Sequence, residues 1–110
     1  MLMDQAYKGA ENVMANMQLV VQGGASFAQA LLLKLAGAGI LVASPPVIWN
    51  KHGRFENAPT QVMRLSAGRT GESAYQIQTS DLEGAARGLM ECRAALEQLI
   101  ATVVGDLAKA

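Results

Sequence analysis

The last thirty residues of the chain carry one apolar seam with the spacing of an α-helix. Small or apolar side chains recur there at alternating intervals of three and four residues, which places them on one side of a helix for about three heptads. Ser80 can act as the N-cap and Glu83 can return the hydrogen bond, as in a capping box. The pattern predicts one unbroken helix over residues 80–109. The seam consists of Leu82, Ala85, Leu89, Cys92, Leu96, Leu99 and Val103.

A helix of this length would be roughly 45 Å long, at about 1.5 Å per residue. A compact monomer of 110 residues has a radius of gyration of only about 13 Å. We therefore expect the helix to overhang the body of the protein or to find a partner. The seam is the predicted interface of a homo-oligomer.

Two more helices are predicted in the N-terminal half of the chain. Residues 4–22 carry an apolar stripe with helical spacing, and Gly23 and Gly24 then predict the end of this helix. Residues 25–43 are the most apolar run of the chain and predict a second helix. Pro45 and Pro46 end that helix, because neither has a backbone donor and each disfavours helix before it.

The run of residues 25–43 is close to the minimum length for a membrane span. Lys34 at its centre costs roughly 2.5 to 3.5 kcal/mol on insertion scales. Gly37 and Gly39 weaken the helix further. We expect a buried core helix and no membrane span. Two alternatives stay open, namely a membrane helix and a break at Gly37 to Gly39 followed by a short strand at residues 40–42.

Residues 47–79 are richer in Thr, Gln, Arg and Gly and predict a small β element. Tyr75 and Ile77 alternate with glutamines, which is the two-residue period of a half-buried strand. Residues 62–65 predict its partner strand, residues 67–71 a hairpin loop with two glycines, and residues 47–49 a third short strand. The predicted fold is a single domain over residues 1–110, helix-dominated α+β. It has two N-terminal helices, a small antiparallel β element at about 47–79 and a long C-terminal helix.

Charge and residue types favour a protein without catalytic chemistry. Nine basic side chains balance nine acidic ones, so no overall field draws the chain to nucleic acid. A single cysteine excludes an intramolecular disulfide and a Cys-rich zinc site, and His52 has the surroundings of a solvated loop histidine. We find no candidate catalytic, cofactor-binding or metal-ligating residues, and we expect no enzyme and no cofactor. The N-terminus lacks a basic start followed by an apolar stretch, so we expect a cytoplasmic protein.

Residues 49–69, called the basic segment below, interleave cationic and planar side chains. Planar side chains can stack on bases and cationic ones can neutralise phosphates. A solvated loop and a protein-binding surface are the competing interpretations, and we expect no nucleic-acid partner at physiological salt. The candidate residues for contact with an anion or a partner are Trp49, Lys51, Arg54, Arg64 and Arg69.

The leading functional hypothesis is a non-enzymatic interaction or assembly protein that self-associates through its C-terminal helix. An accessory subunit of a phage or mobile-element machine would be one setting for such a protein. The alternative is a small nucleic-acid-binding accessory or regulatory protein that uses the basic central segment. A third hypothesis is an enzyme whose site is completed across a subunit interface. The sequence offers no candidate residue for such a site.

Overall fold

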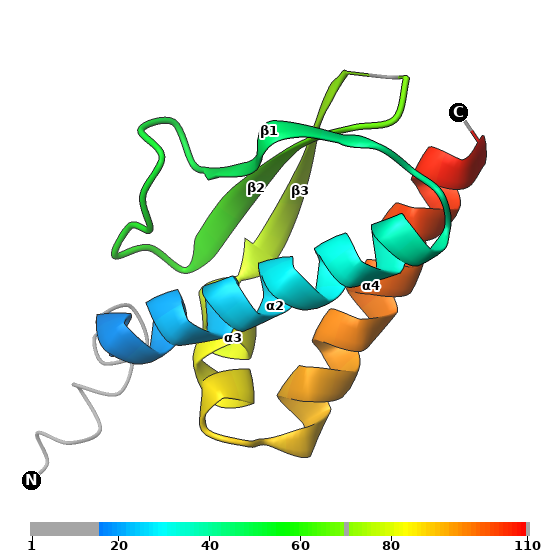
Figure 1. The fold of residues 1–110 in the computed structure, drawn as a ribbon. Helices are drawn as coiled ribbons and strands as arrows, with labels where there is room; N and C mark the ends of the chain where they lie inside the picture. Colours follow the sequence, from blue (N-terminus) through cyan, green and yellow to red (C-terminus); the bar gives the residue numbers. More distant parts are fainter. Residues whose placement is uncertain (1–15, 70, 110) are drawn as a thin grey trace, which may run out of the picture.

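The structure is a computed structural model that describes residues 16–69 and 71–109 (Figure 1). It contains helix α2 (Met17–Gly37), strands β1 (Val42–Trp49), β2 (Thr60–Ala67) and β3 (Glu72–Gln78), and helices α3 (Thr79–Ala86) and α4 (Met90–Lys109). The strands form an antiparallel sheet in the order β1-β2-β3. The described helices lie on one side of this sheet, as Figure 1 shows, so the predicted α+β class is confirmed.

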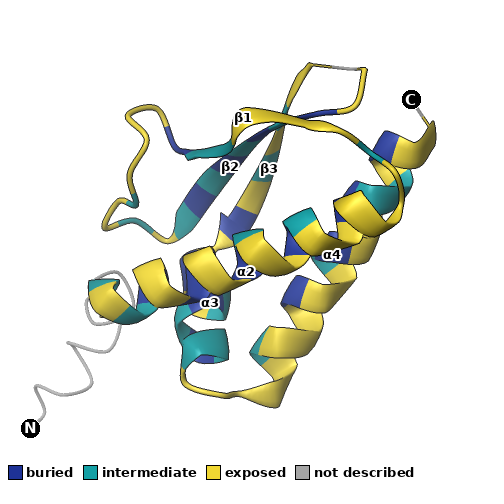
Figure 2. Cartoon of the chain, in the orientation of Figure 1, coloured by how far each residue is buried: buried dark blue, intermediate teal, exposed yellow. Residues whose placement is uncertain are grey.

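The core lies between the sheet and the helix layer, and Figure 2 shows buried residues along these facing surfaces. Every second side chain of β2 is buried, as expected of a strand with one face on the core. In α2 and α4 the buried side chains recur at helical spacing. The buried apolar side chains are Val20, Phe27, Leu31, Leu35, Trp49, Met63, Leu65, Ala67, Ile77, Leu82, Leu96, Ile100, Val103 and Leu107.

The prediction of two N-terminal helices is wrong, because α2 is one helix that runs through Gly23 and Gly24. The part of the first predicted helix before residue 16 lies outside the described residues. The helix predicted for residues 25–43 is also too long, since α2 ends at Gly37 and β1 begins at Val42. The alternative of a break at Gly37 to Gly39 is therefore confirmed, but the strand that follows is Val42–Trp49 and not the predicted residues 40–42.

Close packing explains why the two glycines lie inside a helix. A Cβ atom on Gly23 would collide with the backbone carbonyl group of Leu82, and a Cβ atom on Gly24 would collide with the ring of Phe55. Glycine costs about 1 kcal/mol in a helix interior. At these two positions its missing side chain lets α3 and the aromatic ring lie directly against the backbone of α2. Tertiary packing therefore overrides the local preference of glycine to end a helix.

The C-terminal region is a helical hairpin and not the single unbroken helix that the seam predicts. α3 ends at Ala86, and Gly88 adopts a positive φ of 88°, which glycine tolerates without strain. The amide of Leu89 donates to the carbonyl of Gly84 at 2.9 Å, which satisfies one of the last carbonyl groups of α3. α4 then returns beside α3, so the expected overhang of a long helix does not occur (Figure 1).

The three strands lie where the sequence predicts them, and each is longer than its predicted counterpart. Gly68 and Gly71 both have positive φ, 67° and 80°, in the predicted hairpin between β2 and β3. β1 is longer than the predicted strand and includes Pro45 and Pro46. Proline cannot donate to a ladder and is tolerated in an edge strand, which is the place of β1 in the sheet.

We predict that Gly23→Ala destabilises the protein by about 2–4 kcal/mol, because the added Cβ meets backbone atoms of Leu82 that move only with α3. The matched control is Gly105→Ala in α4, where nothing lies within 4 Å of the added atom. That variant should gain about 0.5–1 kcal/mol from helix propensity. Urea unfolding followed by circular dichroism measures both changes, and equal stabilities would contradict the close approach of α3 to α2.

Candidate interaction surfaces

Most of the predicted interface seam faces the protein's own core. Leu82, Leu96 and Val103 are buried in the contact of α3 and α4 with α2 and the sheet. Ala85, Cys92 and Leu99 are half-buried, and Leu89 alone among the seam residues is exposed, at 47%. A partner that approaches this seam therefore meets its flank and not its centre.

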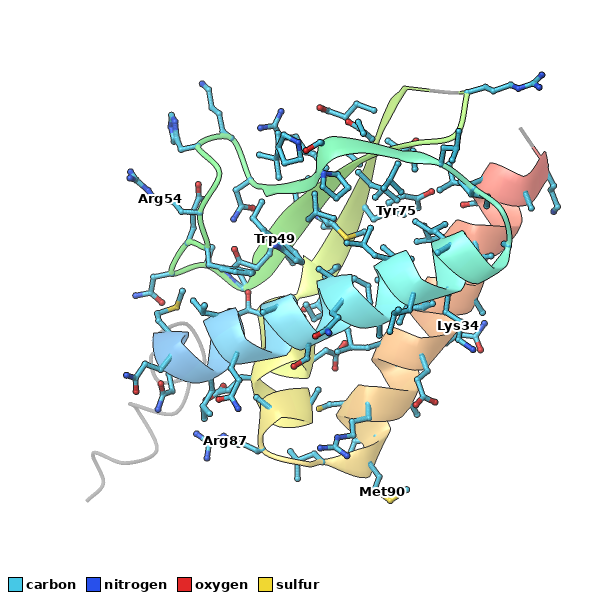
Figure 3. All side chains as sticks on the ribbon, viewed as in Figure 1. Lys34, Trp49, Arg54, Tyr75, Arg87 and Met90 are labelled. Carbon is cyan, nitrogen blue, oxygen red and sulfur yellow. The ribbon has the colours of Figure 1, made fainter. Side chains whose placement is uncertain are left out.

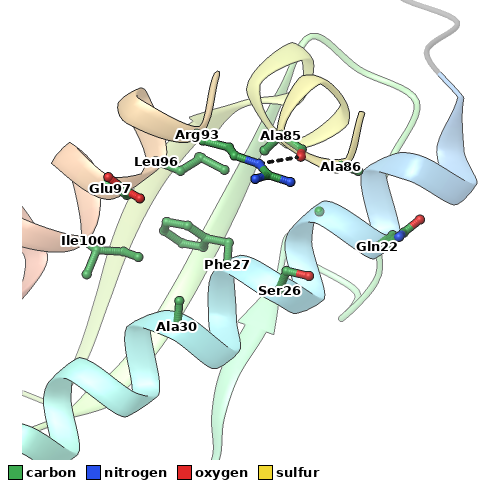
Figure 4. A pocket seen from close by; sticks show the side chains of 11 residues that line it. Gln22, Ser26, Phe27, Ala30, Ala85, Ala86, Arg93, Leu96, Glu97 and Ile100 are labelled. Atoms are coloured by element: carbon green, nitrogen blue, oxygen red, sulfur yellow. Dashed lines mark hydrogen bonds between the residues drawn. The ribbon is translucent and has the colours of Figure 1, made fainter. Parts of the chain in front are cut away.

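An open apolar groove runs along that flank, between α2 on one side and α3 and α4 on the other (Figure 4). Its volume is about 270 Å³. The ring of Phe27 and the side chains of Leu96 and Ile100 form its apolar walls, as Figure 4 shows. The residues that line the groove are Gln22, Gly23, Ser26, Phe27, Ala30, Ala85, Ala86, Arg93, Leu96, Glu97 and Ile100.

Two charged side chains of α4 stand on the wall of this groove. Arg93 and Glu97 are four residues apart, so they lie on the same face of the helix. Nε of Arg93 donates to the carbonyl oxygen of Ala85 at 3.3 Å, which ties its guanidinium group to the end of α3 (Figure 4). Both residues are exposed. The groove thus has an apolar interior and one charge of each sign on α4.

An exposed apolar corner lies next to the groove, where the turn after α3 enters α4. Leu89 is 47% exposed and Met90 is 80% exposed. Figure 3 shows Met90 at the outer end of the helical hairpin, pointing away from the body. Scattered apolar residues are common on surfaces, whereas here two large apolar side chains are consecutive and both are exposed.

The groove was not predicted from the sequence. Periodicity identifies the apolar face of α4 but does not show which other helix lies beside it. Phe27 comes from α2, far away in sequence, so no local pattern links it to Leu96. Arg93 and Glu97 do carry a signal, since their spacing of four residues is visible in the sequence. That signal is shared by many solvated helix faces.

Cys92 belongs to the seam and packs against Gly84, where a Cβ atom would collide with its sulfur. Its thiol is 3.8 Å from the carbonyl oxygen of Ser80, to which it donates. Burial, together with the carboxylates of Asp81 and Glu91, raises the pKa of the Cys92 thiol. A raised pKa leaves less thiolate at neutral pH and makes the sulfur a poor nucleophile.

The loop between β1 and β2, which carries Lys51 and Arg54 of the basic segment, is held in place by buried amide side chains. Gln61 is fully buried. Its Oε1 accepts from Nδ2 of Asn50 at 2.7 Å and from the amide of Glu56 at 3.0 Å. Its Nε2 donates to the carbonyl of Glu56 at 2.7 Å and to Oγ1 of Thr79 at 2.9 Å. All four hydrogen-bonding positions of this amide are used, so the loop is held in one arrangement.

Two aromatic residues anchor the same loop. The rings of Trp49 and Phe55 lie 4.6 Å apart with an interplanar angle of 34°, and Phe55 rests on Gly24 of α2. Trp49 is 9% exposed, and Figure 3 shows it on the inner side of the sheet. The predicted contact residue Trp49 therefore serves the core and does not present its ring for base stacking.

The cationic residues of the basic segment are spread over the sheet. Lys51 and Arg54 are exposed on the loop, and Figure 3 shows Arg54 directed away from the body. Arg64 lies on the outer sheet face, 3.5 Å from the carboxylate of Glu72. Arg69 follows the other end of β2, in the hairpin. Lys51 and Arg64 line one shallow hollow. The structure thus groups Lys51 with Arg64 and leaves Arg69 apart.

Among the described helices, α2 is the one whose length and composition would allow it to cross a membrane. In the structure 33% of its most apolar window is buried. Lys34 lies near its C-terminal end (Figure 3). A core helix of a soluble protein passes the same test of length and hydropathy, so the expected core helix stays a prediction.

No protein-family model matches the chain, and no curated protein or solved structure shows significant similarity to it. Within residues 16–69 and 71–109, no group of three or more His, Cys, Asp or Glu side chains could hold a metal ion. The function must therefore be argued from the surfaces described above.

We predict that Leu96→Asp destabilises the protein by about 3–5 kcal/mol, since it removes core contacts and places a charge where the leucine is 7% exposed. Met90→Asp, on the exposed corner of the same helix, should change the stability of the monomer, measured at nanomolar concentration, by no more than about 0.5 kcal/mol. Urea titrations of the two variants test the distinction. If Leu96→Asp unfolds like the wild type, the seam is not part of the core.

A second prediction concerns Cys92, the single cysteine of the chain. Alkylation at neutral pH should be slower in the folded protein than in urea, because folding raises the pKa of this thiol and partly covers it. Asp81→Asn should speed the reaction of the folded protein by removing one of the carboxylates that raise the pKa. Mass spectrometry over time gives both rates. Equal rates in the folded and unfolded protein would show that the thiol is not protected.

Proposed function

We propose that this protein is a non-enzymatic assembly protein that self-associates through its C-terminal helix, α4. The observation that carries the proposal is the apolar groove beside α4, with Arg93 and Glu97 on its wall. These two charges have opposite signs and lie on one face of one helix. Such an arrangement is complementary to itself, because an antiparallel copy presents the charges in reverse order.

A two-fold axis near Ala95 describes the pairing. It sets Arg93 opposite Glu97 of the partner subunit, and the same exchange gives a second ion pair on the other side of the axis. In this register Met90 faces the position of Ile100 on the partner's α4. Ile100 lines the groove, so the exposed methionine meets an apolar wall.

The proposal also accounts for the apolar corner at the start of α4. Leu89 and Met90 are large, apolar and exposed, and burial of such side chains stabilises an interface by about 25 cal/mol per Å² of apolar area removed from water. In the same antiparallel register Leu89 faces the position of the small residue Ala101 on the partner's helix. The predicted seam contributes its flank to this interface, while Leu82, Leu96 and Val103 stay in the core of each subunit.

Charge reversal tests this pairing. Size exclusion with light scattering should show a dimer or larger oligomer at micromolar concentration for the wild type. Arg93→Glu or Glu97→Arg alone should weaken association about tenfold or more, because each puts like charges opposite one another. The double variant Arg93→Glu/Glu97→Arg should restore it, since the two signs are only exchanged.

Glu91→Arg, an exposed change on the same helix outside the groove, is the matched control and should leave the mass unchanged. Thermal unfolding of each variant separates lost association from lost folding, which matters because Arg93 also holds the end of α3. A wild type that is a monomer at all concentrations would refute the proposal. So would a double variant that associates no better than the single ones.

A further inference from the structure

The two edges of the sheet differ in how they are protected against pairing with another strand. An exposed edge presents unpaired backbone groups, and proteins guard such edges with proline, lysine, bulges or short strands. β1 carries Pro45 and Pro46, and its register with β2 shifts between Val42 and Val47. β1 is therefore a guarded edge.

The opposite edge, β3, has none of these guards. Its seven residues include no proline, lysine or arginine, and its only charged residue is Glu72, at the start of the strand. Its pairing with β2 runs in continuous register from Glu72 to Gln78. Within the described part of the chain, no strand pairs with the outer edge of β3. This edge keeps backbone donors and acceptors in a regular, extended array.

We propose that the outer edge of β3 pairs antiparallel with β3 of a second copy of this chain, which makes one six-stranded sheet from two subunits. A two-fold axis through Tyr75, the central residue of the strand, gives the longest overlap. It pairs Ala74 with Gln76 of the partner subunit and Ser73 with Ile77 of the partner subunit.

The pattern of β3 is compatible with its own copy in this register. Paired positions are separated by an even number of residues, so the core-facing side chains of both subunits stay on one side of the joined sheet. Glu72 falls opposite Gln78 of the partner subunit, so no two like charges meet across the axis. The helix layers of both subunits then cover the same face.

Tyr75 stands at the centre of the proposed contact. It is half-buried on the core-facing side of the strand. Burial raises the pKa of the Tyr75 hydroxyl, and the carboxylate of Asp106 on α4 raises it further. The axis brings two such rings together as a cross-strand aromatic pair.

This surface is separate from the α4 groove, and the inference goes beyond the proposed function. A chain with two different two-fold contacts joins one neighbour through α4 and another through β3. Such contacts alternate along an open row of subunits and do not close into a single dimer. Self-association through both surfaces would therefore produce species larger than a dimer as concentration rises.

The test changes the exposed pair Ala74 and Gln76, which the proposed register sets opposite each other across the axis. Ala74→Glu/Gln76→Glu places carboxylates opposite carboxylates and should abolish pairing of β3. Ala74→Glu/Gln76→Lys differs at one residue, places unlike charges opposite each other and should keep pairing or strengthen it. Both are made in the Arg93→Glu background, so that the mass measured by light scattering reports β3 alone.

Hydrogen exchange gives a second measurement that does not depend on these variants. The outward amides of β3 should become at least tenfold better protected as concentration rises, in the wild type and in Arg93→Glu. Equal masses for the two charge variants would overturn the proposal. So would β3 amides that stay unprotected at every concentration, or that are fully protected in the monomer because the chain's own remaining residues cover the edge. If Arg93→Glu leaves the mass unchanged while the β3 variants alter it, only the α4 pairing is refuted.

Discussion

The buried amide of Gln61 is the interaction on which the arrangement of this fold depends. It lies where four segments meet: the end of β1, the loop after it, β2 and the first residue of α3. Its partners include Asn50 on one side and Thr79 on the other, and the Thr79 hydroxyl in turn donates to the carbonyl of Ala58 at 2.6 Å. A buried amide without partners would cost free energy, whereas a fully satisfied one selects a single arrangement of the segments around it. The loop between β1 and β2 is thereby held against the sheet. α3 begins at Thr79, directly after the last residue of β3.

From that point the helix layer follows by close packing. α3 starts at the end of β3 and crosses α2 at Gly23, where backbone lies directly on backbone. The turn at Gly88 then sends α4 back along the open side of α2. α2 and α4 touch along part of their length, and the space left beside that contact is the groove. The proposed interaction surface is thus a consequence of the angle at which the helical hairpin meets α2.

Local patterns predicted the parts of this structure that depend on neighbours in sequence. The alternation around Tyr75 and Ile77 and the glycines at Gly68 and Gly71 identified the β3 strand and its hairpin, because strand period and positive φ are local properties. Gly23 was misread for the opposite reason. Its meaning depends on Leu82, which lies far along the chain, and a sequence alone does not show which backbone will approach a glycine.

The candidate site was harder to predict than the fold. Helical spacing correctly marked Leu96 and Val103 as apolar-face residues, but spacing does not distinguish a face covered by the same chain from a face covered by a copy. The basic segment raised a different difficulty. Lys51 and Arg69 are near in sequence, yet β2 lies between them and carries them to opposite ends of the sheet. Charge density along a sequence is therefore a poor guide to charge density on a surface of β structure.

The stack of Trp49 on Phe55 gives the protein an internal optical reporter. Trp49 is the only tryptophan of the chain, it is nearly buried, and its neighbour Phe55 rests on Gly24 of α2. The indole thus sits where the loop, the sheet and the first described helix meet. If the loop left α2 while the helices stayed intact, the emission of this indole would shift to longer wavelength without any loss of helical signal. Opening of the loop can therefore be told apart from unfolding by light alone, with no label attached.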